Sequence, residues 1–179
     1  MSDIINQAIP SIPDWPVPGV IYRDITGLLT NPKAFKLSVD LIADFMLQSG
    51  VEYIVAPDAR GFIWSAAVAY KLGLPIHMVR KPGKLPPPVI TQDYEYEYAS
   101  GSLQMKANVD IGSKTKIGIV DDVNATAGTA LAIAQLLSRL GAETKNISYA
   151  CVVDLPFLGG RDRITDVGMK FFRTTEYNG

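Results

Sequence analysis

Apolar positions in the first half of the chain repeat with two different periods. Between Asn31 and Gly50 they recur every three or four residues, which places them on one face of a helix that an asparagine caps and a glycine ends. A short β-branched run follows at 51–56, then a small-residue apolar segment at 61–72, then a second strand-like run at 75–80. Strand, helix and strand in this order predict a βαβ unit of a parallel sheet.

The same pattern returns in the second half of the chain. It predicts a strand at 116–120, a helix at 129–140 and a strand at 146–153. These strands are apolar without alternation, which indicates that helices cover both faces of the sheet. The sequence therefore predicts one α/β domain over residues 1–179, with a central, mostly parallel sheet flanked by helices. The first thirty residues and those from Gly159 onward are expected to wrap on this core as extensions.

Residues 81–102 interrupt the pattern. The segment is rich in proline at its start and in tyrosine at its end, and it has no sustained apolar alternation. A loop of this length inside a compact domain is usually functional or mobile. We therefore expect a long, flexible loop that serves the active site.

Composition excludes several classes of partner. The formal net charge of −1 gives no overall field for nucleic acid or anionic membranes, so neither is expected as a partner. Neither a basic, apolar secretory start nor a run long enough to span a bilayer is present, which favours a cytoplasmic protein. The single cysteine, Cys151, lies in an apolar run and is expected to be a buried thiol. The single histidine, His77, is expected to pack within a strand without a catalytic role.

Two adjacent acids mark the first candidate site. Asp121 and Asp122 follow the strand at 116–120, and the small residues of 125–129 begin the next helix. Backbone amides of such a turn can surround a phosphate, while carboxylates accept hydrogen bonds from sugar hydroxyls, directly or around Mg²⁺. The combination indicates a sugar phosphate as ligand. The alternative is an acidic helix cap at a tight turn.

Two further segments should reach the same edge, because ligands of parallel sheets bind beyond the carboxyl ends of the strands. One contains Ala59 and Arg60, where small residues allow close approach to a diphosphate and the arginine offers a planar pair of donors. The other places three cations, Arg80, Lys81 and Lys84, within five residues. Each segment alone could equally be an exposed turn.

Together these segments resemble the type I phosphoribosyltransferases, which bind 5-phosphoribosyl-1-pyrophosphate. The motifs IPDWPVPGVIYRDITGLL, YIVAPDARGFIW, RKPGKLP, YEYEYASGSLQM, GIVDDVNATAGTA and LGGRDRI follow the order found in members that act on adenine, and they cover nearly the full chain. The resemblance implies the corresponding fold, with a hood over the base at residues 1–30 and the flexible loop at 81–102. It also implies a Mg²⁺-dependent reaction of adenine with phosphoribosyl pyrophosphate to give AMP and pyrophosphate, in a homodimer.

The resemblance further implies roles for individual residues. Those expected to hold the sugar phosphate are Asp121 and Asp122, which serve the ribose hydroxyls and the Mg²⁺ shell, the adjoining Val123, and Ala125, Thr126, Ala127, Gly128 and Thr129, which cradle the 5′-phosphate. Those expected to face the pyrophosphate are Ala59, Arg60, Lys81, Lys84 and, from the neighbouring subunit, Arg80. Those expected at the base are Ile21, Tyr22 and Arg23 of the hood, with Tyr22 stacked on the purine, and Glu97 beside Tyr98.

Glu97 is expected to exchange a proton with the purine as N9 attacks C1′ of the ribose through an oxocarbenium-like transition state. Its neighbour Glu95 is the alternative for this role, and ordinary packing is the alternative for Tyr22. Three positions depart from the family pattern: Asn124 replaces an apolar residue, and Ala127 and Ala99 replace glycines.

Two rival functions stay open. Hypoxanthine and guanine phosphoribosyltransferases resemble this chain but carry an aspartate at the position of Ala125, so its absence favours adenine. A non-catalytic module that senses phosphoribosyl pyrophosphate would need an added DNA-binding segment, for which no basic recognition helix is visible.

Overall fold

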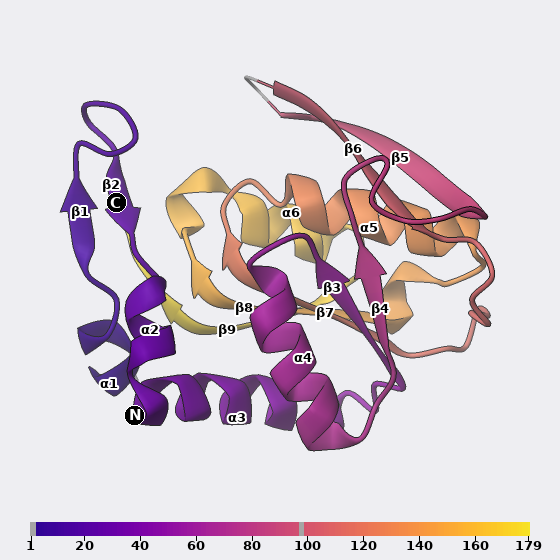
Figure 1. Cartoon of the computed structure of the whole chain (residues 1–179), viewed down its shortest axis with the longest axis horizontal. Helices are drawn as coiled ribbons and strands as arrows, with labels where there is room; N and C mark the ends of the chain where they lie inside the picture. The colour runs from indigo at the N-terminus through magenta and orange to yellow at the C-terminus, as the bar shows by residue number, and fades with distance from the viewer. Residues whose placement is uncertain (1–2, 97–98) are drawn as a thin grey trace.

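A five-stranded parallel sheet forms the centre of the computed structural model, which describes residues 3–96 and 99–179 (Figure 1). The strand order is β4-β3-β7-β8-β9. The bounds are Ile76–Val79 for β4, Tyr53–Pro57 for β3, Ile117–Asn124 for β7, Ile147–Asp154 for β8 and Lys170–Glu176 for β9. All neighbouring pairs are parallel, which confirms the predicted fold class.

Helices cover both faces of this sheet. One core includes side chains of α3 (Pro32–Gln48) and α4 (Gly61–Leu72), and the other includes side chains of α5 (Gly128–Arg139) and α6 (Gly160–Asp166). Every residue of β8 is buried, as its lack of apolar and polar alternation predicted, and the buried set includes the polar Ser148 and Asp154. Two short 3₁₀ turns, Thr144–Asn146 and Pro156–Leu158, flank β8.

The predicted cap of α3 is present. The Asn31 side chain accepts a hydrogen bond from the Ala34 amide at 3.1 Å, and Pro32 occupies the first turn. Inside the core, Trp64 is fully buried and its indole N–H donates to the Ser38 hydroxyl at 2.9 Å. This bond satisfies the polar atom of the aromatic ring that joins α4 to α3.

The N-terminal segment adds two short helices, which pack on the core, and a two-stranded ribbon. It contains α1 (Asp3–Gln7), the antiparallel strands β1 (Ser11–Pro13) and β2 (Ile21–Arg23), and α2 (Thr26–Thr30). The ribbon rises at one end of the molecule, with the C-terminus beside it (Figure 1). This arrangement places β2, which carries the predicted hood residues, near the end of β8.

Two predictions of local structure are wrong. Residues 89–96 and 99–102 are not an irregular loop: β5 (Val89–Tyr96) pairs with β6 (Ala99–Lys106) in an antiparallel hairpin. Ile90 and Tyr94 turn toward the core, and the polar Gln92 between them hides the alternation. The C-terminal segment is not a wrapped extension either, because β9 is an edge strand of the central sheet.

Candidate active site

Two buried carboxylates lie at the carboxyl end of β7. Asp121 and Asp122 belong to the strand itself, not to the turn after it, and they are 7% and 6% exposed. One oxygen of Asp121 accepts a hydrogen bond from the Asp122 amide at 2.9 Å. Burial raises the pKa of Asp121 well above its usual value, and the negative charge of Asp122 raises it further. Such a pair favours ligands that bring hydroxyl donors or positive charge.

A turn of small residues follows directly and lines a hollow. Its walls come from Asp121, residues 123–130 and Tyr149. Ala127 adopts a left-handed conformation with φ of 65°, and α5 begins at the next residue. The N-terminus of α5 therefore lies at this hollow, and a helix N-terminus favours a bound anion. Ala127 takes a conformation that favours glycine, which is the residue that the resemblance led us to expect at this position.

The hollow is supported from below by α6. The Gly160 amide donates to the Ala125 carbonyl at 3.1 Å, and the Arg163 guanidinium donates to the Thr126 carbonyl at 2.6 Å. A Cβ at Gly160 would lie only 2.2 Å from the Ala125 carbonyl oxygen. The approach of the two backbones thus requires glycine. Sequence reasoning quoted the GGRDR motif but gave these residues no role.

Arg60 joins the carboxylates to the hood. Its Nε lies 2.5 Å from an oxygen of Asp122, and its Nη1 donates to the Tyr22 hydroxyl at 2.8 Å. Tyr22 also packs edge-on against Trp15, with ring centroids 4.3 Å apart. At the start of α4, Gly61 allows the helix to approach Asp121, since a Cβ there would lie 2.9 Å from that carboxylate. Residues from β2, β7 and the β3–α4 turn therefore meet at this place.

The basic segment after β4 lies on the other side of the β3–α4 turn. Arg80 Nε donates to the Asp58 carboxylate at 3.0 Å, and its guanidinium lies 5.5 Å from the centre of the Phe62 ring. The peptide bond between Asp58 and Ala59 is cis. Lys81 and Lys84 are exposed. This chain thus places one predicted cation in an internal ion pair and leaves two open to solvent.

An apolar cavity lies between the hood and the chain that follows β8. It is lined by residues 19–21, Arg23, Leu155, Phe157, Leu158 and Gly179. The Arg23 guanidinium stacks over Tyr177 at 4.2 Å from the ring centre and donates to the Gly179 carbonyl at 2.9 Å. The sequence predicted the hood residues of this cavity but not Leu155, Phe157 and Leu158. The one feature of the sequence that could have indicated these three is their position directly after a predicted strand.

Several predicted positions need separate mention. Glu97 and Tyr98 lie outside the residues that the structure describes. Cys151 is a buried, free thiol, and His77 stacks on Tyr53 with ring centroids 5.3 Å apart. Within residues 3–96 and 99–179, no group of three or more histidine, cysteine or acidic side chains could hold a metal ion. No helix in the same ranges is long and apolar enough to cross a membrane.

Residues 25–175 match the model of the phosphoribosyl transferase domain. The chain belongs to the phosphoribosyltransferase family, a class of glycosyltransferase-type enzymes.

Within this class, the chain is similar to several proteins named adenine phosphoribosyltransferase. The adenine phosphoribosyltransferase of Haemophilus ducreyi is 44% identical over 99% of this chain and 97% of its own length. The adenine phosphoribosyltransferase of Thermoanaerobacter pseudethanolicus superposes with a TM-score of 0.88 at 36% identity, over 99% of this chain and all of the other. The APRTase of Giardia lamblia, solved with 9-deazaadenine, superposes with a TM-score of 0.91 at 26% identity, over 99% and 98% of the two chains.

Proposed function

We propose that this protein transfers the 5-phosphoribosyl group of phosphoribosyl pyrophosphate to adenine and releases AMP and pyrophosphate, a reaction of purine salvage. The observation that carries the proposal is the buried pair Asp121 and Asp122 beside the small-residue hollow at 125–129. The pair suits the two ribose hydroxyls, and the hollow suits the 5′-phosphate. The names of the full-length relatives support adenine as the base.

The site fits a role for Mg²⁺ in this reaction. Two adjacent carboxylates, Asp121 and Asp122, are too few to enclose a cation, but Mg²⁺ commonly binds through one or two carboxylates, water and substrate phosphates. A cation near these residues also offsets the burial and the repulsion by Asp122 that together raise the pKa of Asp121. When bound, Mg²⁺ neutralises charge on the departing pyrophosphate.

The chain supplies the other charges of the reaction. As N9 of adenine attacks C1′, the bond to pyrophosphate breaks and negative charge grows on the leaving group. We assign the stabilisation of that charge to the cations Arg60, Lys81 and Lys84. Arg60 can stabilise it while its Nε stays ion-paired with Asp122 at 2.5 Å, because the guanidinium has further N–H donors. Glu97 exchanges the purine proton, and residues 81–102 exclude water from the activated sugar.

The base is assigned to the apolar cavity under the hood. Its walls combine Ile21 with Leu155 and Phe157, which suit the faces of a purine. Backbone groups of Ile21 and Arg23 supply hydrogen bonds to the purine edge. Ala125 offers no carboxylate to a purine ring, whereas the hypoxanthine and guanine enzymes resemble this chain with an aspartate there. These features support adenine over the oxopurines.

A homodimer is part of the proposal. Four large apolar side chains are exposed on α4 and on the edge strand β4: Ile63, Tyr70, Ile76 and Met78. Ile63 and Tyr70 are seven residues apart and share one face of the helix. A second copy would cover this surface and bring a second Arg80 near the site, as the resemblance implies. Light scattering on Tyr70→Glu and wild type measures whether the dimer forms and depends on this face.

We also place the enzyme in the cytoplasm. Its one cysteine, Cys151, is a buried free thiol, which agrees with a reducing compartment.

A panel of purines tests the assignment. The purified chain with Mg²⁺ and phosphoribosyl pyrophosphate should convert adenine to AMP and should use hypoxanthine and guanine poorly. Equal use of hypoxanthine would refute the base assignment. If no base reacts while the sugar diphosphate still binds, the protein is a sensing module and not a transferase.

A further inference from the structure

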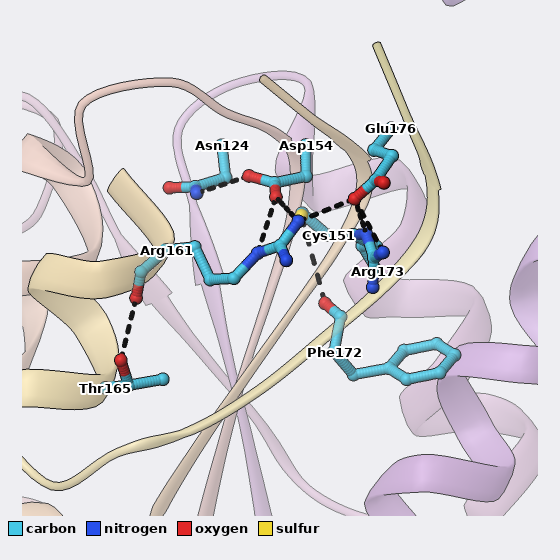
Figure 2. A network of polar contacts seen from close by, with 8 residues as sticks. All are labelled: Asn124, Cys151, Asp154, Arg161, Thr165, Phe172, Arg173 and Glu176. Carbon is cyan, nitrogen blue, oxygen red and sulfur yellow. Dashed lines mark hydrogen bonds and ion pairs between the residues drawn. The ribbon is translucent and has the colours of Figure 1, made fainter. Parts of the chain in front are cut away.

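A polar network joins the ends of β7, β8 and β9 to α6 (Figure 2). Its centre is Asp154 at the end of β8, which is fully buried. One carboxylate oxygen accepts from Asn124 Nδ2 at 2.8 Å, and the other accepts from Arg161 Nε at 3.1 Å and from Nη2 at 2.8 Å. A buried carboxylate requires this kind of compensation, because its desolvation is costly.

The network also reaches the edge of the sheet. Arg161 lies on α6, and its Nη2 donates to Glu176 at the end of β9 at 2.6 Å. Arg173 donates to the same oxygen of Glu176 at 2.6 Å (Figure 2). Arg161 therefore joins two acids on neighbouring strands, whereas Arg173 contacts only the outer one among the bonds drawn.

The helix that carries Arg161 also holds the phosphate loop, residues 125–129. The amide of its first residue, Gly160, donates to the Ala125 carbonyl, and the Arg163 side chain donates to the Thr126 carbonyl. On the other side, Asn124 is the last residue of β7 and directly precedes the loop. The Oδ1 atom of Asn124 is buried and has no hydrogen-bond partner among the described residues, so the bond to Asp154 alone orients this amide.

We infer that Asp154 and Arg161 are positioning residues that hold the phosphate loop in its binding geometry without touching the sugar phosphate, and that Asn124, which also lines the hollow, links Asp154 to the loop. Asp154 fixes the strand end before the loop through Asn124 and fixes the helix beneath it through Arg161. A displacement of the loop amides weakens every bond that they donate to a phosphate. The identity of the ligand rests on the proposed function, but the ordering of the loop does not.

Arg161→Gln is the test variant, and Arg173→Gln is its matched control. The two side chains are 33% and 35% exposed, and each loses one ion pair to Glu176. Of these two arginines, only Arg161 contacts Asp154. We expect Arg161→Gln to raise the KM for phosphoribosyl pyrophosphate roughly tenfold while leaving that for adenine nearly unchanged. Arg173→Gln should leave both near their wild-type values. Arg161→Lys, which keeps the charge but not the paired donors, should fall between.

Two measurements do not depend on turnover. Calorimetric titration with ribose 5-phosphate should show weaker binding for Arg161→Gln than for Arg173→Gln. Hydrogen exchange of the 125–129 amides should be faster in the first variant only. If wild type transfers no base but these two differences appear, the proposed function fails and the positioning inference stands.

Other results overturn the inference. Equal binding and equal exchange in the two arginine variants would assign the network to stability alone. If Arg161→Gln does not fold, Asn124→Leu replaces it as the test variant. This substitution removes the hydrogen bond from Asn124 to Asp154 and keeps the ion pair between Arg161 and Asp154. Wild-type affinity of Asn124→Leu for ribose 5-phosphate would then refute the inference.

Discussion

Replacing Gly160 by alanine should weaken the binding of phosphoribosyl pyrophosphate, because the added methyl collides with the phosphate loop. The new Cβ would lie 2.2 Å from the Ala125 carbonyl oxygen and 2.9 Å from the Ala127 nitrogen. Non-bonded atoms are comfortable at about 3.5 Å. The helix and the loop must therefore separate by roughly 1 Å, and neither contact is a side chain that could rotate away.

The size of the effect follows from this displacement. A shift of about 1 Å in the groups that position a substrate can cost as much as about 10²-fold. We expect the KM for phosphoribosyl pyrophosphate to rise roughly 10- to 100-fold in Gly160→Ala. The KM for adenine should change little, since the cavity under the hood does not include Gly160. Steady-state kinetics with each substrate varied in turn separates the two effects.

The neighbouring residue provides the control. Gly159 has φ of 72°, but no atom lies within 4 Å of a Cβ added there. Gly159→Ala should destabilise the fold by about 1–2 kcal/mol through its left-handed backbone, and it should leave the KM values nearly unchanged. Denaturant unfolding measures the first effect. An unchanged KM for phosphoribosyl pyrophosphate in Gly160→Ala, or an equal rise in Gly159→Ala, would refute the steric argument.

Three further substitutions test single side chains. Tyr22→Phe removes the hydroxyl that accepts the 2.8 Å hydrogen bond from Arg60. It should raise the KM for phosphoribosyl pyrophosphate by an amount equivalent to about 0.5–1.5 kcal/mol. An unchanged KM would mean that this bond does not position Arg60. Glu97→Gln should lower kcat by ~10²–10⁴ while ribose 5-phosphate still binds in calorimetry, whereas equal losses would make Glu97 a binding residue. Burial and Asp122 raise the pKa of Asp121, so the folded protein holds a proton that the unfolded chain releases, and stability is lost as pH rises above 3.8 through the raised pKa. Asp121→Asn should therefore exceed wild type in unfolding free energy by more at pH 8 than at pH 4, and a difference independent of pH in urea titrations would contradict the assignment.

The central sheet could be predicted because its strands are buried on both faces. The residues at 117–120 are all apolar or glycine, those at 147–153 are interrupted only by Ser148, and each run became a strand of the parallel core. The hairpin could not be predicted in the same way. Its inward positions include Gln92, so composition there does not separate core from surface. The edge strand β9 is only partly buried. It therefore mixes charged and apolar residues and lacks the continuous apolar pattern of the central strands.

The candidate site was predictable where its chemistry is local in sequence. Asp121, Asp122 and the turn at 125–129 are contiguous, so one motif carries both the acids and the phosphate hollow. Contacts between distant segments were not predictable. The support of Ala125 by Gly160 depends on two backbones that meet in space, and a glycine alone does not reveal which chain approaches it. The wall formed by Leu155 likewise depends on how the hood closes.

Because all five strands of the sheet are parallel, all their carboxyl ends lie at one edge of the sheet, and the candidate site is confined to that edge. Arg60, Arg80, Asp122 and Leu155 all lie at or just beyond the carboxyl ends of strands. The opposite rim is built from short turns, such as the one at 141–146, where the side chains of Glu143 and Lys145 pair in solvent. A dye or an affinity handle attached at that turn would report on the enzyme while staying clear of its chemistry.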